Sequence, residues 1–170
     1  MKPRTRILGV DPGLRVTGYG VISVSSNGSR EERIDLVEAG IIRTDTGTGI
    51  AARLSKVYRA LSEVITELKP DILVIEKLYA HYKHPATAIL MGHARGVVCL
   101  LSGTHQVTLV NLASTRVKKA VTGRGHAGKM QVQRMVQHAL QLKALPEPAD
   151  VADALAIALA YVSHLKKKES

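Results

Sequence analysis

The order of local hydrophobic patterns along the 170 residues limits the possible folds more than any other feature. Three segments with the alternating or apolar pattern of β-strands come first, at 4–10, 18–24 and 34–43. The Asn27-Gly28 pair predicts a turn between the second and the third, so we expect an antiparallel meander. Strands that come first and then alternate with helices predict an α/β fold, in which a mixed sheet has helices on both faces.

The rest of the chain supplies those helices and two more strands. Helical periodicity or composition predicts helices at 50–68, 86–101, 113–121, 129–142 and 150–165. Wholly apolar or alternating runs predict short strands at 72–75 and 107–110. The length suits one domain, which we expect to span 1–165, with a frayed basic tail at 166–170.

Composition excludes several classes of protein. Hydrophobic residues make up 45% of the chain, enough for a core, so wholesale disorder is excluded. The single cysteine, Cys99, excludes an intramolecular disulfide and a cysteine-based zinc cage, and its apolar neighbours place it in the core. No apolar run approaches the roughly 18 residues of a membrane-spanning helix, and the N-terminus lacks a signal-peptide pattern. We therefore expect a cytoplasmic protein without membrane contact.

The distribution of charge points to a polyanionic partner. Lys and Arg number 24 against 14 Asp and Glu, a net charge of +10. The stretch 111–143 contains no acidic residue and seven basic ones: Arg116, Lys118, Lys119, Arg124, Lys129, Arg134 and Lys143. Such a block favours nucleic acid as the partner, and the alternative is a solvated basic face.

Two carboxylates follow apolar strands. Asp11 comes after Ile7 to Val10, and Glu76 comes after Ile72 to Ile75. Ligands of open α/β sheets bind at the carboxyl ends of the strands, where a carboxylate loses hydration and needs a cationic partner. The alternatives are ordinary turn chemistry at Asp11-Pro12-Gly13 and a salt bridge at Glu76.

Asp150 and Asp153 open the last predicted helix. They are three residues apart and share one face, although a helix cap and the helix dipole also explain them. Together with Asp11 and Glu76 they form a set of four carboxylates in a strongly basic chain. Hard divalent cations such as Mg²⁺ take oxygen ligands, and a pair of them stabilises both oxygens of a phosphodiester displacement. The set therefore predicts metal-dependent phosphodiester chemistry.

The segment 123–129, GRGHAGK, matches the first seven positions of a Walker A loop. Met130 stands where that loop carries its Mg²⁺-binding hydroxyl, and the segment follows a predicted helix rather than a strand. We therefore expect a basic loop, with Arg124 in it, that contacts a sugar-phosphate backbone.

Four segments together resemble one family. They are GVDPGLRVTGYGVI (9–22), ILVIEKLYAHYKHPATAILMGHARGVV (72–98), TRVKKAVTGRGHAGKMQVQRMV (115–136) and PADVADALAIALAY (148–161). In this order they resemble the RuvC family of bacterial Holliday-junction resolvases. The resemblance implies a ribonuclease H-like fold, a five-stranded mixed sheet flanked by helices. It also implies symmetric hydrolysis of two strands of a four-way DNA junction, with 5′-phosphate products, in recombination and repair.

The resemblance also implies roles for individual residues. The catalytic and metal-binding carboxylates would be Asp11, Glu76, Asp150 and Asp153, holding two Mg²⁺ ions that Mn²⁺ can replace. Lys118 and Lys129 would contact DNA near the cleaved phosphate. Tyr79 stands where the family usually has a Phe that stacks on bases at the junction centre, and Tyr82 is the alternative for that role.

Partners follow from the same resemblance. The family acts as a homodimer alongside RuvA and RuvB, and the helix 86–101 is a candidate interface. Its apolar residues are Ile89, Leu90, Val97 and Leu101, and Gly92 and Gly96 permit close approach. The alternative is that this helix only packs on the sheet. Two other functions remain open: a YqgF-type RNA-processing nuclease of the same fold, and a non-catalytic nucleic-acid-binding module.

Overall fold

A five-stranded mixed sheet forms the centre of the computed structural model, which describes residues 4–26, 32–77 and 85–166. Its strands are β1 (Arg4–Asp11), β2 (Val16–Ser26), β3 (Glu32–Arg43), β4 (Ile72–Glu76) and β5 (Thr108–Leu112). They lie in the order β3-β2-β1-β4-β5. The first three pair antiparallel, whereas β4 is parallel to both β1 and β5. The predicted meander and mixed sheet are confirmed, and the Asn27-Gly28 turn lies outside the described residues.

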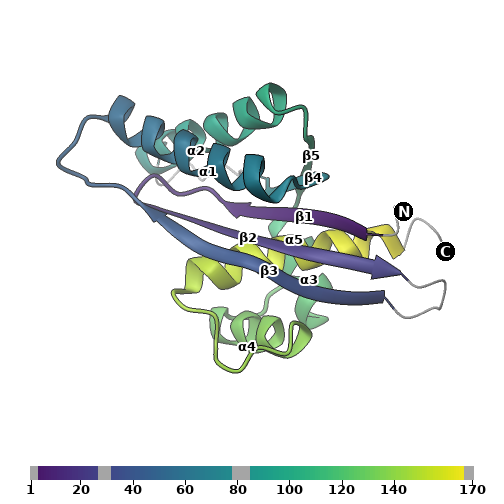
Figure 1. The fold of residues 1–170 in the computed structure, drawn as a ribbon. Coiled ribbons are helices and arrows are strands. Elements are labelled where there is room, and N and C mark those ends of the chain that lie inside the picture. The colour runs from purple at the N-terminus through teal and green to yellow at the C-terminus, as the bar shows by residue number, and fades with distance from the viewer. Residues whose placement is uncertain (1–3, 27–31, 78–84, 167–170) are drawn as a thin grey trace.

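Helices cover both faces of this sheet (Figure 1). On one face lie α1 (Ile50–Leu68) and α2 (Pro85–Thr104), and on the other lie α3 (Ser114–Thr122), α4 (Lys129–Ala139) and α5 (Ala149–Lys166). Each face has its own apolar core, because neighbouring residues of β1 point to opposite sides: Ile7 packs with α5 and Leu8 with α1. No helix in the described part of the chain is long and apolar enough to cross a membrane.

Several predicted boundaries differ from those of the structure. The helix predicted at 129–142 ends at Ala139, because Leu140 leaves helical geometry and Gln141 has a left-handed φ of 51°. The side-chain amide of Gln137 donates to the carbonyl of Leu142 at 3.3 Å and so holds the chain in this turn. The strand predicted at 107–110 lies at 108–112, and β1 extends one residue further than predicted, to Asp11.

Glycines on β1 and β2 let α5 lie directly on the sheet. A Cβ at Gly9 would stand 2.2 Å from the carbonyl oxygen of Ala154, and one at Gly18 would stand 2.1 Å from that of Asp150. The helix is apolar and buried around most of its circumference, with five alanines, at every second position from Ala152 to Ala160, among its buried residues. This close approach brings the first turns of α5 to the end of β1.

Candidate active site

The ends of two parallel strands place two carboxylates side by side. Val10 of β1 pairs with Ile75 of β4, and the next residue on each strand is Asp11 and Glu76. Asp11 also pairs with Gly18, the glycine that contacts the backbone of Asp150 on α5. The predicted acids thus come from three elements that meet at one edge of the sheet.

The four carboxylates share one electrostatic environment. Burial, together with the negative charges of Asp153, Glu76 and Asp150, raises the pKa of Asp11 to about 7. Burial is also the main cause that raises the pKa of Glu76 and of Asp153. Negative charges this close to one another disfavour ionisation. The carboxylates therefore need positive charge beside them to be ionised together.

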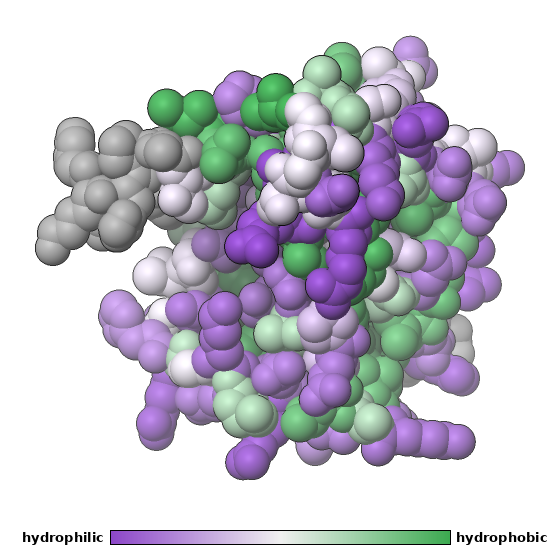
Figure 2. All heavy atoms as spheres, turned by 90° about the vertical axis from the view of Figure 1, so that its left-hand side faces the viewer, coloured by the Kyte–Doolittle hydropathy of each residue, from purple (hydrophilic) through white to green (hydrophobic). Residues whose placement is uncertain are grey.

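Part of that positive charge comes from the two predicted lysines. A pocket of about 210 Å³ is lined by Asp11, Glu76 and Asp153 together with Lys118 of α3 and Lys129 of α4. Lys129 lowers the pKa of Asp11 and of Asp153, and Lys118 lowers the pKa of Glu76. Figure 2 shows the end of the molecule at which β1 ends, where hydrophilic side chains surround a recess.

Asp150 lies near this pocket without lining it. Because α5 begins at Ala149, Asp150 stands in the first turn of the helix rather than at the predicted cap position. Its charge still raises the pKa of Asp11 and of Asp153. Asp150 therefore acts on the pocket as a neighbouring negative charge.

Two residues of the site were not predicted from the sequence. Ser114, the first residue of α3, donates a hydrogen bond to the Glu76 carboxylate and lowers its pKa. Arg95 of α2 donates to the backbone carbonyl of Glu76 and to the Asn111 side chain, and lines a small pocket next to Asp11. No sequence pattern shows either contact, because both depend on how the helices dock beside the end of β4.

The remaining predicted residues lie elsewhere. Arg124 is exposed in the loop between α3 and α4, where its backbone bonds to the Thr122 hydroxyl, and it does not line the carboxylate pocket. Tyr79 and Tyr82 lie outside the described residues.

The donor chemistry of the pocket fits hard divalent cations. In 4–26, 32–77 and 85–166, no three His, Cys, Asp or Glu side chains lie in an arrangement that could by itself hold a metal ion. Mg²⁺ does not require one, since it keeps several waters and binds through one or two carboxylates plus substrate phosphate. The oxygen donors for such an ion would be Asp11 and Glu76 at the ends of two strands and Asp153 on α5, whose pKa values are all raised.

Comparison with known proteins identifies the family. Residues 7–161 match the family model described as crossover junction endodeoxyribonuclease RuvC. The chain belongs to the RuvC family. The RuvC of Rhodopirellula baltica is 47% identical over 153 residues, which cover 90% of this chain and 83% of that protein. The predicted family and enzyme class, a crossover junction endodeoxyribonuclease, are confirmed.

Solved RuvC structures share the fold. Thermus thermophilus RuvC is 29% identical, with a TM-score of 0.85 over 96% of this chain and 97% of its own. The same relative in complex with a Holliday junction substrate is 27% identical, with a TM-score of 0.87 over 96% of both chains. The predicted ribonuclease H-like fold is therefore confirmed.

Proposed function

We propose that this chain resolves Holliday junctions by hydrolysing one phosphodiester bond in each of two strands of a four-way DNA junction. The observation that carries the proposal is the pocket in which Asp11, Glu76 and Asp153 face Lys118 and Lys129. The Thermus relative with the same fold was solved with its junction substrate, which supports the same class of substrate here. Because such an enzyme needs access to the chromosome, we place it in the cytoplasm, acting in recombination and repair.

Asp11, Glu76 and Asp153, with Asp150 beside them, would hold two Mg²⁺ ions, and we expect Mn²⁺ to replace them. When bound, such ions supply Lewis-acid stabilisation to the attacking and leaving oxygens and give 5′-phosphate products. The hydrogen bond from Ser114 favours the ionised form of Glu76, the form that binds a cation. Arg95 fixes the backbone of Glu76 and so orients its carboxylate.

The basic residues would position the DNA. Lys118 and Lys129 extend into the carboxylate pocket and would offset the charge that develops on the cleaved phosphate. Arg124, exposed in the α3–α4 loop, would contact the backbone outside that pocket.

We also propose Tyr79 as the aromatic residue that stacks on bases at the junction centre. Stacking needs only a π face, worth about 1–3 kcal/mol per base, so Tyr79→Phe should cleave normally and Tyr79→Ala should cleave slowly. If Tyr82→Ala slows cleavage and Tyr79→Ala does not, the stacking role belongs to Tyr82.

The outer face of α2 supports a homodimer. Ile89 and Leu100 are 61% and 57% exposed, and with Gly96 and Gly103 they form an apolar stripe at helical spacing. Added Cβ atoms at these glycines would meet nothing within 4 Å. A helical glycine costs about 1 kcal/mol relative to alanine, so a partner's close approach explains Gly96 better than packing within the chain does.

The candidate interface predicted from the sequence needs correction. Leu101 is fully buried, because α2 packs on the sheet side through Ala94, Val98 and Leu101. Cys99, expected in the core, is exposed beside Leu100.

Two equivalent sites related by a two-fold axis suit a reaction that needs two symmetric cuts. We further propose that the dimer works with RuvA and RuvB.

The proposed function is tested by cleavage of a panel of labelled substrates. A four-way junction, a duplex, a flap and a structured RNA are incubated with the protein, with Mg²⁺ or with EDTA. We expect paired nicks with 5′-phosphates in the junction, only with Mg²⁺. Preferential cleavage of the RNA, or binding without any metal-dependent cleavage, would overturn the proposal.

A further inference from the structure

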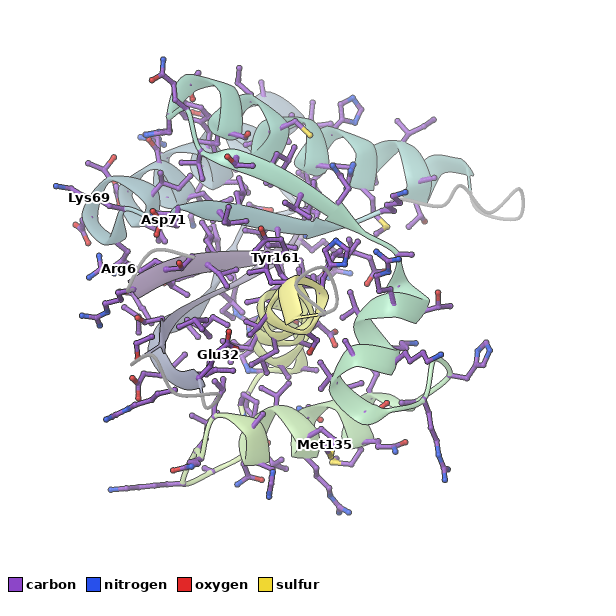
Figure 3. All side chains as sticks on the ribbon, turned by 90° about the vertical axis from the view of Figure 1, so that its right-hand side faces the viewer. Arg6, Glu32, Lys69, Asp71, Met135 and Tyr161 are labelled. Atoms are coloured by element: carbon purple, nitrogen blue, oxygen red, sulfur yellow. The ribbon has the colours of Figure 1, made fainter. Side chains whose placement is uncertain are left out.

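A second pocket lies behind α3, on the side away from the carboxylates. Ser114, Val117 and Lys118 line the carboxylate pocket, whereas the other side of the same helix carries Arg116 and Lys119. The second pocket measures about 860 Å³. Figure 3 shows this end of the molecule, with α5 viewed end-on at Tyr161 and α3 beside it. One short helix thus separates two pockets that both carry positive charge.

Small residues give this second pocket its space. Its walls include Ala113, Ala120, Ala160, Gly123 and Gly125. The hydroxyl residues Thr115 and Ser163 also line it, and a hydroxyl can donate a hydrogen bond to an anionic oxygen. The pocket therefore combines room with polar donors.

The charged side chains that line the second pocket are basic. Among the residues that the structure describes, the titratable ones that line it are Arg116, Lys119 and His164, and none of its described lining residues is a carboxylate. Neither Arg116 nor Lys119 forms an ion pair with any residue in the described ranges. Arg116 stands in the first turn of α3, against the helix dipole, and repels Lys119 three residues later. Both effects disfavour this arrangement in the free protein, and a bound anion would relieve both.

The two pockets lie at different levels along α5. Asp153 and Ser163 line different pockets on α5 and are ten residues apart in sequence, about 15 Å along the helix at 1.5 Å per residue. A strand of B-DNA advances about 3.4 Å per nucleotide, so this length corresponds to about four base pairs. Arg124, between Gly123 and Gly125, also lies beside the second pocket rather than the first.

We propose that the pocket behind α3 binds a backbone phosphate of the junction arm, about four base pairs from the cleaved bond. The proposal rests on the proposed function, since it takes junction DNA as the substrate. It assigns Arg116 and Lys119 to holding the arm, separately from Lys118 and Lys129 at the carboxylates.

The test measures binding without cleavage. In an Asp11→Asn background with EDTA, the affinity for a fluorescent four-way junction is measured across a salt series, with and without Arg116→Ala/Lys119→Ala. The double variant should flatten the slope of log affinity against log salt by about 0.9, the value for the one phosphate that the pocket no longer neutralises. Lys56→Ala/Arg59→Ala is the matched control, because this pair has the same spacing on an exposed face of α1 and should leave the slope unchanged.

Neutral methylphosphonate linkages then locate the bound phosphate. Placed one at a time along the arm, a linkage about four base pairs from the cleavage point should weaken binding by the Asp11→Asn protein and leave the double variant unaffected. Equal weakening in both proteins at every position would overturn the proposal, as would an unchanged salt slope. The proposal would also be overturned if Arg116→Ala/Lys119→Ala, in a protein that keeps Asp11, slowed cleavage with Mg²⁺ but left junction affinity unchanged. Cleavage by the wild-type protein is scored separately, so a junction that is bound but not cut would contradict only the proposed function.

Discussion

At the scale of single residues, the protonation state of Asp11 depends on neighbours that are distant in the sequence. Asp11 and Glu76 are candidates because each follows a short apolar run, and Asp153 because it shares a helix face with Asp150. The raised pKa of Asp11 depends on burial and on three other charges, which only the docking of α5 and β4 brings together. The contact of Ser114 with Glu76 was missed for the same reason.

The pKa of Asp11 predicts a pH-dependent cost in stability for the metal-free protein. Its value is about 7 in the folded state against a reference of 3.8, so the folded state prefers the protonated acid. The stabilising contribution is complete below pH 3.8 and is lost as the pH rises through 7. Asp11→Asn avoids this loss and should unfold in EDTA at pH 8 with about 2–4 kcal/mol more stability than the wild type.

Denaturant unfolding in EDTA from pH 5 to pH 9 checks this expectation. The difference between Asp11→Asn and the wild type should grow with pH up to about 7 and then level off. Parallel pH dependences of the two proteins would show that Asp11 is not held in this environment. Mg²⁺ should stabilise the wild type more than the variant.

Lys129 belongs to the same charge balance. Removing it raises the pKa of Asp11 and of Asp153 further and deletes a cation from the pocket. Lys129→Ala should therefore slow junction cleavage at least about tenfold and flatten the salt dependence of binding by about 0.9. Lys143→Ala, an exposed lysine of the same basic block, is the control and should cleave at the wild-type rate. Equal rates for both variants would leave Lys129 without a role in the reaction.

At the scale of elements, periodicity predicted where most strands and helices lie. It predicted less well where some of them end and which of their faces are buried. The helix at 50–68 was predicted to the residue, because its apolar positions recur on one face and Pro70 follows it. The end of α4 was misplaced, because Leu142 continues the apolar pattern although the chain has turned at Gln141. Burial of α2 on one side only was not visible, since its apolar residues occur around the whole helix.

The glycines under α5 provide a test at this scale. Gly9→Ala forces a Cβ against the backbone oxygen of Ala154, so α5 must move away from the sheet. We expect a loss of about 1–3 kcal/mol in unfolding free energy, together with slower cleavage, because Asp153 moves with the helix. Gly49→Ala, at the N-cap of α1, meets nothing within 4 Å and should cost only about 0.5–1 kcal/mol, because glycine is preferred over alanine at that position. Similar unfolding curves for the two variants would refute this role of Gly9.

At the scale of the whole molecule, the described part of one chain offers one pocket lined by several carboxylates, and a junction needs two cuts. Gly96→Gln tests the proposed two-fold assembly, because a Cβ at this position meets nothing within 4 Å in the single chain, whereas a long side chain would keep a partner helix from approaching closely. Analytical ultracentrifugation at micromolar concentration should give near twice 18.3 kDa for the wild type and 18.3 kDa for the variant. Thr66→Gln, exposed on α1, is the control and should stay dimeric. A dimer that survives Gly96→Gln would place the interface elsewhere.

The most direct measurement of the central claim compares binding and cleavage of a four-way junction by the wild type, Asp11→Asn and Glu76→Gln in Mg²⁺. Both substitutions remove negative charge from the pocket and leave Lys118 and Lys129 in place. Junction affinity should therefore hold or rise, because repulsion between the carboxylates and the phosphates is relieved, while the cleavage rate falls by about 10² or more. Near-normal cleavage by either variant would contradict the assignment of this pocket as the active site.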